Sequence, residues 1–279
     1  MFGRTFYHES IRKYVIVFGN MFNGIYVQRF NNAGARIQNI KVPIAYGPKQ
    51  KFLTRLNQDP NLDRDVAISL PRMGFEMISI NYAANRKTTG LYKNVYVNTD
   101  DKNKLKTQYQ PVPYDINFTL SIFVRNADDG AQVLEQILPY FQPEWTNNIK
   151  LIPEMDIVMD VPTVLQGTSI EDTYEGDFES RRALIYNLDF IMKGYVYGPV
   201  SNSGIIKRAI IDFSPNMPES PVQERVKVTP GLLANGEPTT NSSASIAIGG
   251  ITANDNYGIA EDFFEIGQPG DAELWVSQN

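Results

Sequence analysis

The sequence predicts an α+β fold, in which a mixed, mainly antiparallel β-sheet is flanked by about three helices and followed by an extended C-terminal tail. The clearest strand signal runs from Asp115 to Val124, where polar and apolar residues alternate and only Phe123 interrupts the polar face. Asp128 and Asp129 then suit the positive end of a helix. The apolar residues of that helix recur at helical spacing: Leu134, Ile137, Leu138 and Phe141.

The first part of the chain predicts two more helices and three strands. Ser10 can cap a helix whose apolar residues form one stripe: Ile11, Tyr14, Val15, Phe18 and Phe22. Two strands, 25–30 and 36–46, follow and are joined by a polar turn. Pro48 is well placed to open a short helix, and residues 66–82 form a long strand candidate.

The second part of the chain predicts further strands. Residues 155–164 and 184–192 both alternate between apolar and polar side chains, and an acidic turn at 171–179 separates them. A last strand is expected at 205–213. We therefore expect the sheet to be complete before the prolines that begin at Pro215.

The chain changes character after residue 215. We divide it into an α+β domain, residues 1–215, and an acidic extension rich in Pro, Gly, Asn and Ser, residues 216–279. Residues 228–279 contain seven acidic side chains and no Lys or Arg, so their net charge is −7. Since the whole chain has a net charge of −5, residues 1–227 have a net charge of +2. A nearly neutral body with an acidic tail is typical of proteins that bind other proteins rather than nucleic acid.

Few residues suit catalysis or metal binding. The chain has no cysteine, which excludes disulfides and thiolate sites, and His8 is its only histidine. An acidic cluster is the best candidate for a carboxylate pair or a cation site: Glu171, Asp172, Glu175, Asp177 and Glu179. Gly176 is out of register for a calcium loop, so we expect a solvated turn, with no metal and no cofactor. The apolar run from Tyr14 to Phe18 is too short for a signal peptide or a membrane span, and we expect a soluble, non-secreted protein.

One stretch carries a resemblance to a known family. Residues 120–125 (Leu-Ser-Ile-Phe-Val-Arg), Asp128-Asp129 and residues 134–143 (Leu-Glu-Gln-Ile-Leu-Pro-Tyr-Phe-Gln-Pro) resemble the tail sheath stabiliser and completion proteins of T-even-type contractile-tailed phages. Further matches follow in the same order along the chain: Met1-Phe2-Gly3, residues 40–46, Leu70-Pro71-Arg72, Arg181-Arg182, Gly194 and Pro199-Val200. The resemblance covers residues 1–215, and nothing is carried over to the tail.

The resemblance implies a non-enzymatic structural protein of the virion, assembled in the host cytoplasm. It implies a ring, expected to be a hexamer, that caps the tail tube and sheath, holds the sheath extended and offers a docking surface to the neck of the head. The implied partners are other copies of the chain, the tail sheath protein, the tail tube or its terminator, and neck or head-completion proteins. DNA is expected only as cargo that passes through the lumen, and no membrane is involved. Tail terminators are described as a sheet flanked by helices, in agreement with the predicted fold.

Interaction surfaces are therefore the sites to predict. Interfaces favour aromatic residues and arginine, which points to four residues in or near the matched segments: Tyr140, Phe141, Arg181 and Arg182. The alternative is packing at a helix end and ordinary charges before a strand. Apolar residues of the acidic extension can dock on a neighbour, or the extension can be a disordered tail: Phe263, Phe264 and Trp275.

A basic segment lies between residues 85 and 107. Its cations outnumber its acids, Asp100 and Asp101, to give a net charge of +4: Arg86, Lys87, Lys93, Lys102, Lys104 and Lys106. Facing a lumen, this segment would contact DNA phosphates without reading sequence. Facing outward, it would meet an acidic neighbour, including the tail of another subunit. The third alternative is a solvated hairpin.

Two other functions remain as alternatives. One is a virion-associated, carboxylate-dependent hydrolase of cell-wall polymer, which would use Glu175 or Asp177. The other is a neck or baseplate adaptor of similar fold.

Overall fold

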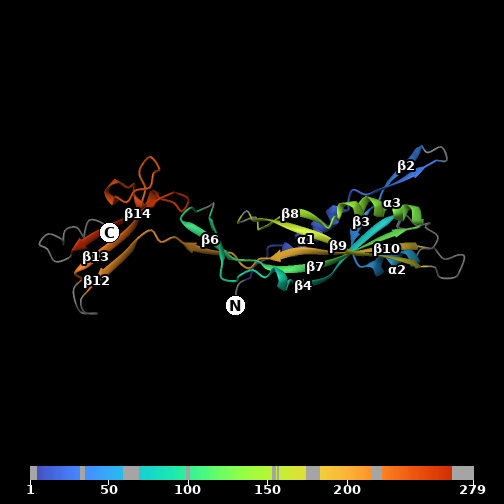
Figure 1. Ribbon diagram of the computed structural model, residues 1–279, viewed down its shortest axis with the longest axis horizontal. Helices are drawn as coiled ribbons and strands as arrows, with labels where there is room; N and C mark the ends of the chain where they lie inside the picture. Colours follow the sequence, from blue (N-terminus) through green and yellow to red (C-terminus); the bar gives the residue numbers. More distant parts are fainter. Residues whose placement is uncertain are drawn as a thin grey trace. The chain divides into compact units, whose positions relative to one another are not determined.

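The structure, a computed structural model, describes residues 5–31, 35–58, 69–98, 101–152, 155, 157–173, 183–214 and 222–265 (Figure 1). The chain forms two compact units. The first comprises Met1–Tyr92 and Tyr109–Pro199, and the second comprises Lys93–Gln108 and Val200–Asn279. This division differs from the single predicted boundary at residue 215, because a segment from the middle of the chain pairs with the residues that follow 200.

The first unit is built on a six-stranded sheet. The strands lie in the order β3 (Ile44–Tyr46), β4 (Arg72–Tyr82), β7 (Val112–Val124), β10 (Ala183–Val196), β9 (Ile157–Thr173) and β8 (Glu144–Ile152). β3 and β4 are parallel, and every other neighbouring pair is antiparallel. The predicted α+β class, with a mixed and mainly antiparallel sheet, is therefore confirmed.

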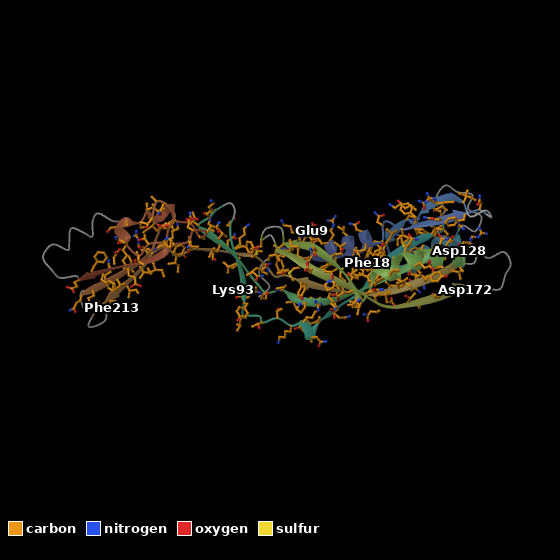
Figure 2. All side chains as sticks on the ribbon, turned by 45° about the horizontal axis from the view of Figure 1, so that its top comes forward. Glu9, Phe18, Lys93, Asp128, Asp172 and Phe213 are labelled. Carbon is orange, nitrogen blue, oxygen red and sulfur yellow. The ribbon has the colours of Figure 1, made fainter. Side chains whose placement is uncertain are left out.

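Two helices pack on one face of this sheet, α1 (Ser10–Met21) and α3 (Ala127–Ile137). Phe18 of α1, labelled in Figure 2, stacks on Phe118 of β7 with ring centroids 4.4 Å apart and also contacts Phe190 of β10 at 5.4 Å. The alternating residues of β7 supply this core, because every second side chain of a strand points to the same side: Ile116, Phe118, Leu120, Ile122 and Val124 are all buried.

The opposite face is covered at one end by α2 (Lys49–Gln58). Phe52 packs against Phe123 with ring centroids 5.5 Å apart, in a cluster that includes Ile185. Gly74 of β4 makes room for this helix, since a Cβ atom there would lie 2.4 Å from the Phe52 ring. The single apolar residue on the polar side of the predicted strand, Phe123, is thus explained by a second small core.

A separate hairpin, β1 (Tyr26–Phe30) and β2 (Arg36–Lys41), projects from the first unit beside α3 (Figure 1). The predicted strand 36–46 is in fact two strands in different sheets. β2 ends at Lys41, and after Val42 and Pro43 the chain enters β3 of the six-stranded sheet. Proline lacks the amide hydrogen that would continue the ladder, which accounts for the break.

The second unit contains two three-stranded sheets. One has the order β11 (Ser201–Gly204), β6 (Lys104–Tyr109) and β5 (Lys93–Val97), and the other has the order β12 (Ala209–Phe213), β13 (Glu224–Gly231) and β14 (Gly258–Glu265). A loop with the short 3₁₀ turns η4 (Ser242–Ala244) and η5 (Ile248–Gly250) connects β13 to β14. Residues beyond 215 were predicted to be extended chain, and 224–231 and 258–265 instead form paired strands.

Several predicted elements are shifted. Ser10 is the first residue of α1 rather than its cap, and Glu9 at the cap position makes no side-chain cap bond. α3 ends at Ile137 and passes into the 3₁₀ turn η2 (Leu138–Tyr140), and Val133 is buried rather than Leu134 or Leu138. The strand predicted at 155–164 continues to Thr173, so Glu171 and Asp172 lie on β9 and not in a turn.

Candidate functional site

The described part of the chain contains no cluster of three or more His, Asp or Glu side chains that could hold a metal ion. Nε2 of His8 lies 2.9 Å from the carbonyl oxygen of Gly198, so this histidine is bonded to backbone. Glu171 accepts from Lys49 and, at 2.8 Å, from Asn187 Nδ2, and the bond from Lys49 is the main cause of its lowered pKa. Glu175, Asp177 and Glu179 lie outside the described residues. Glu171 thus links β9 to α2 and β10.

Exposed apolar surfaces are the next candidate sites. The first is a groove of about 910 Å³ in the first unit, between the C-terminal ends of α1 and α3 and the strand β8. Its apolar lining comes from both helices, η2 and β8: Phe22, Ile25, Ile137, Tyr140, Phe141 and Trp145.

None of the described helices is long and apolar enough to cross a membrane.

The predicted interface pair Tyr140 and Phe141 has two different environments in this groove. Phe141 is half-buried, and its ring lies 5.1 Å from Phe190 in the core. Tyr140 is 61 % exposed and meets the 40 % exposed Trp145 edge to face at 5.5 Å. Tyr140 and Trp145, which we call the aromatic rim, are therefore the side chains that a partner would reach. Trp145 was missed from the sequence, because β8 was not predicted. Arg181 and Arg182 lie outside the described residues.

The basic segment is divided between the two units. Arg86 and Lys87 belong to the first unit, and Lys93, Lys102, Lys104 and Lys106 belong to the second. Arg86 is already used within the fold, because its Nη2 donates to Asp115 Oδ1 at 2.7 Å and to the Tyr114 carbonyl oxygen at 3.0 Å.

In the second unit, the side chain of Lys104 pairs with Asp101 at 3.0 Å, and this hydrogen bond is the main cause of the lowered pKa of Asp101. Lys93 and Lys102 are exposed, whereas Lys106 is half-buried. Whether these cations face a lumen or a neighbouring subunit stays a prediction.

The β12–β13–β14 sheet has one covered face and one open face. On the covered face, a Cβ atom at Gly231 or Gly258 would lie 2.2 Å or 2.6 Å from the Thr239 carbonyl oxygen, so the connecting loop packs directly on the strands. On the open face, Ile211, Val226 and Phe263 stand opposite one another on the three strands, and Phe263 is 72 % exposed.

The predicted docking residues of the extension are therefore separated. Phe263 lies on the open face and Phe264 on the other face of the same strand, and Trp275 lies outside the described residues.

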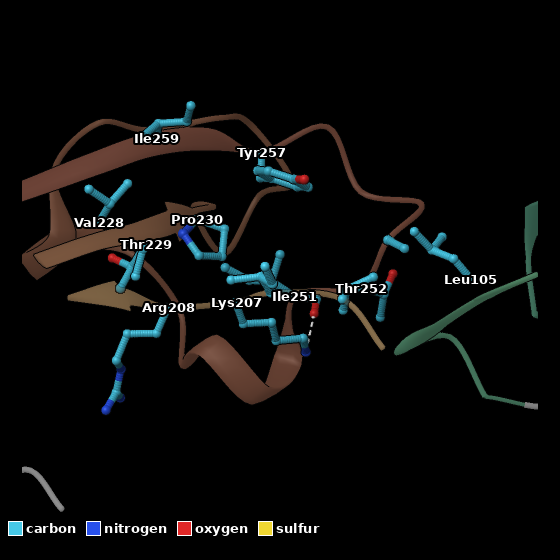
Figure 3. A pocket seen from close by; sticks show the side chains of 14 residues that line it. Leu105, Lys207, Arg208, Val228, Thr229, Pro230, Ile251, Thr252, Tyr257 and Ile259 are labelled. Atoms are coloured by element: carbon cyan, nitrogen blue, oxygen red, sulfur yellow. Dashed lines mark hydrogen bonds between the residues drawn. The ribbon is translucent and has the colours of Figure 1, made fainter. Parts of the chain in front are cut away.

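A pocket of about 310 Å³ opens beside Val228, Pro230 and Ile259 (Figure 3). Lys207 lines it, but its ammonium donates to the carbonyl oxygens of Ile248 at 3.2 Å and Ile251 at 2.6 Å. The residues that line this pocket include no acid and no histidine. The pocket thus has no general acid or base of those types, and it extends the apolar surface of the open face.

Sequence reasoning also missed that the β1–β2 hairpin has one protected edge and one unprotected edge. Gln132 and Gln136 of α3 bond the backbone of β1 at Gln28 and Tyr26. The outer edge of β2 has no strand partner in the described part of the chain. A polar turn between two apolar runs predicts the hairpin but not its neighbours, and these depend on the tertiary fold.

Comparison with known proteins identifies the family. The family described as T4-like virus Myoviridae tail sheath stabiliser matches residues 5–260. The chain is also 34 % identical over 234 residues to the tail completion protein gp15 of Enterobacteria phage T4, covering 81 % of this chain and 84 % of that protein. The family match continues past residue 215, where the resemblance read from the sequence ended, and it does not favour the hydrolase alternative. The chain therefore belongs to the T4-like virus Myoviridae tail sheath stabiliser family and is a structural protein of a contractile phage tail.

Proposed function

We propose that copies of this protein close into a ring, a hexamer, that caps the tail tube and sheath and keeps the sheath extended. The family description names sheath stabilisation, and the T4 relative is named a tail completion protein. A head-to-tail contact between identical chains closes into a ring when its rotation permits. The broad six-stranded sheet with a core on both faces supplies a rigid body for such a ring.

The observation that carries this proposal is the groove with its aromatic rim. Exposed aromatic side chains beside an apolar hollow are typical of protein interfaces, because they bury a large area and lose little conformational entropy. Tyr140 and Trp145 occupy such a position, and Phe141 anchors the groove to the core. The groove thus supports a partner of protein nature.

The proposed partners are the sheath protein, the tail tube or its terminator, and the neck or head-completion proteins. Arg181 and Arg182 complete the proposed interface with Tyr140 and Phe141. Three exposed cations of the basic segment, Lys87, Lys93 and Lys102, would face either the DNA that passes through the lumen or the acidic tail of a neighbouring subunit, and a solvated hairpin is the alternative. The protein is proposed to reach the virion by assembly in the host cytoplasm and to make or break no covalent bond.

Electron microscopy and native mass spectrometry of the purified chain test the ring. We expect ring-shaped particles of about six chains, each chain having a mass of 31.5 kDa. Antibody labelling of intact virions should mark the head end of the tail, and label at the baseplate would instead favour the adaptor alternative. A chain that stays monomeric both alone and with isolated tails would overturn the proposal. Clearing of purified peptidoglycan by the protein would overturn its non-enzymatic part.

A further inference from the structure

Two glutamine side chains of α3 hold the β1–β2 hairpin by hydrogen bonds to the backbone of β1. Gln132 accepts from the Gln28 amide at 2.9 Å and donates to the Gln28 carbonyl oxygen at 3.2 Å. Gln136 accepts from the Tyr26 amide at 3.3 Å and donates to the Tyr26 carbonyl oxygen at 2.7 Å. The two side chains thus satisfy the outward backbone groups of β1, as a neighbouring strand would. Among the described residues, the β1 edge of the hairpin is therefore covered and the β2 edge has no strand partner.

The open edge of β2 is both exposed and cationic. Five of its six residues are exposed, and Ile37 is 67 % exposed. Arg36 and Lys41 form no ion pair with any described residue. Because Tyr26 and Gln28 direct their backbone groups toward α3, their partners Lys41 and Asn39 direct theirs away from β1. An unpaired edge of this kind can accept another strand.

β14 in the second unit is an edge strand of opposite charge. It pairs with β13 over its whole length and with no other strand in the described part of the chain. It carries Glu261, Asp262 and Glu265 and no Lys or Arg, and neither glutamate has an ion-pair partner among the described residues.

The direction of the β14 backbone groups follows from a proline. Ile259 stands opposite Pro230, which has no amide hydrogen to donate to β14. A proline within a sheet takes a position where its nitrogen faces away from the partner strand. The backbone groups of Ile259, and by alternation those of Glu261 and Phe263, therefore point to the open edge.

We propose that the β2 edge of one copy pairs with the β14 edge of a second copy, so that the sheet of one subunit gains the hairpin of the next. This inference rests on the proposed ring and names the strands that would join its subunits. A second copy is the occupant because this chain itself supplies both edges, with opposite charge and with outward backbone groups on each. Strand addition of this kind gains affinity from main-chain hydrogen bonds and specificity from side chains.

The charges of the two strands fit an antiparallel register. With Asn39 opposite Glu261, Lys41 stands opposite Ile259 and diagonal to Glu261, on the same side of the sheet. At the other end, the register of β2 shifts between Gln38 and Arg36, so Arg36 lies on the same side of the sheet as Lys41 and comes within two residues of Glu265. Both cations thus come close to acids in this arrangement.

Cysteine cross-linking tests the pairing, because the chain has no cysteine of its own. Directly opposed strand residues have Cα atoms about 5.5 Å apart, within the range of a disulfide. The full-length variants Asn39→Cys and Glu261→Cys, mixed and oxidised in the assembled state, should form a disulfide-linked dimer, and the double variant should form a ladder of linked chains. Glu224→Cys is the matched control, since it removes an exposed glutamate from the same sheet. It should not link to Asn39→Cys.

Charge reversal gives an independent measurement. Lys41→Glu and Glu261→Lys should each weaken ring assembly at least tenfold, and the two changes combined in one chain should restore it. Rings that assemble without the Asn39–Glu261 link, or a double reversal that fails to restore assembly, would overturn this inference and leave the proposed ring intact. Self-linking of Asn39→Cys alone would replace the head-to-tail pairing with a β2–β2 contact. The absence of any assembly would overturn both proposals.

Discussion

The side chain of Gln132 bonds both backbone polar groups of Gln28, with the amide at 2.9 Å and the carbonyl oxygen at 3.2 Å. A glutamine amide has the same donor and acceptor as a peptide group, which allows a helix side chain to take the place of a strand. Gln136 repeats the arrangement at Tyr26. The hairpin is thus attached to α3 partly through its own backbone groups.

The first prediction concerns these two glutamines. The double variant Gln132→Ala/Gln136→Ala should lower the free energy of unfolding by about 2 kcal/mol, because each side chain contributes two hydrogen bonds of about 0.5–1.5 kcal/mol that water partly replaces. Amide hydrogen exchange should speed up at Tyr26 and Gln28 and stay unchanged in β7. Glu135→Ala, an exposed change on the same helix, is the control and should leave both quantities unchanged. Faster exchange throughout the six-stranded sheet would contradict a local docking role.

The second prediction concerns the ion pair that secures the same hairpin. Arg29 Nη2 lies 2.7 Å from Asp129 Oδ2, and Asp129 is only 1 % exposed. Its other oxygen, Oδ1, has no hydrogen-bond partner within the described structure. Arg29→Ala should destabilise the fold by about 2 kcal/mol at neutral pH, because it leaves a buried carboxylate unpaired. Asp129→Asn should lower the free energy of unfolding by less than Arg29→Ala does, since the Arg29 side chain left behind is partly exposed and water can hydrate it.

The pH dependence of Arg29→Ala has a definite sign. Burial raises the pKa of Asp129, and the Arg29 charge opposes this rise. A raised folded-state pKa means that the penalty of the buried charge is absent below the unfolded value of about 3.9 and grows as the pH rises through the folded-state pKa. The destabilisation by Arg29→Ala should therefore be smaller near pH 4 than at pH 7, measured by urea unfolding. Asp129→Asn should show no such dependence, and a larger loss in acid would contradict the assignment.

The third prediction concerns Gly130 of α3, where alanine should destabilise the helix although it usually stabilises one. Replacing glycine by alanine inside a helix usually stabilises it by about 1 kcal/mol. At Gly130 of α3, however, a Cβ atom would lie 2.2 Å from Cε2 of Tyr186. Gly130→Ala should therefore destabilise the fold by about 1–3 kcal/mol, as overpacking does. In a Tyr186→Leu background the same change should cost much less, and thermal unfolding of the four proteins in this cycle measures the difference. An equal cost in both backgrounds would point to a cause other than this contact.

The fourth prediction concerns a tyrosine that also recognises backbone. The Tyr14 hydroxyl donates to the Tyr195 carbonyl oxygen at 2.7 Å and accepts from the Tyr195 amide at 2.8 Å, beyond the point where β10 stops pairing with β9. Tyr14→Phe should lower the free energy of unfolding by about 1–3 kcal/mol, because it leaves both partly buried backbone groups of Tyr195 without this partner. Tyr7→Phe, at an exposed site, is the control and should change nothing.

The same tyrosine should be visible in an alkaline titration. Burial raises the pKa of Tyr14 far above its ordinary value and raises the pKa of Tyr197 to about 12. In an ultraviolet titration of the folded protein, these two groups should stay protonated at pH 11, and the Tyr14→Phe variant should remove one late step. Full ionisation of all tyrosines by pH 11 in the folded state would contradict their burial.

The sequence was sufficient to predict elements whose burial pattern is regular. β7, β10 and α1 have apolar residues at a constant period, because one side of each faces the main core. Phe123 broke the pattern, and the structure explains it through α2 on the other face. A residue that violates the period can thus report a second packing partner.

The sequence was not sufficient to predict the edge strand β8 or the C-terminal strands β13 and β14. In the edge strand β8, the polar residue Asn147 lies on the inward side between Trp145 and Ile149, so the apolar alternation is interrupted. In β13 and β14, Gly231 and Gly258 lie directly under the connecting loop at Thr239, a contact that depends on the tertiary fold. The groove shows the same limit, since Tyr140 and Trp145 meet only because the 3₁₀ turn η2 returns the chain to β8.

The last prediction separates an interface from a core in that groove. Tyr140→Ser should weaken ring assembly about thirtyfold, the equivalent of the 2 kcal/mol typical of an interfacial aromatic anchor, and leave the melting temperature unchanged, because its ring is exposed. Phe141→Ala should instead lower the free energy of unfolding by about 2–3 kcal/mol, since its ring packs on Phe190. Light scattering across a concentration series measures assembly, and calorimetry measures stability. If Tyr140→Ser destabilised the monomer and spared assembly, the aromatic rim would belong to the fold, and the interface would have to lie elsewhere on the chain.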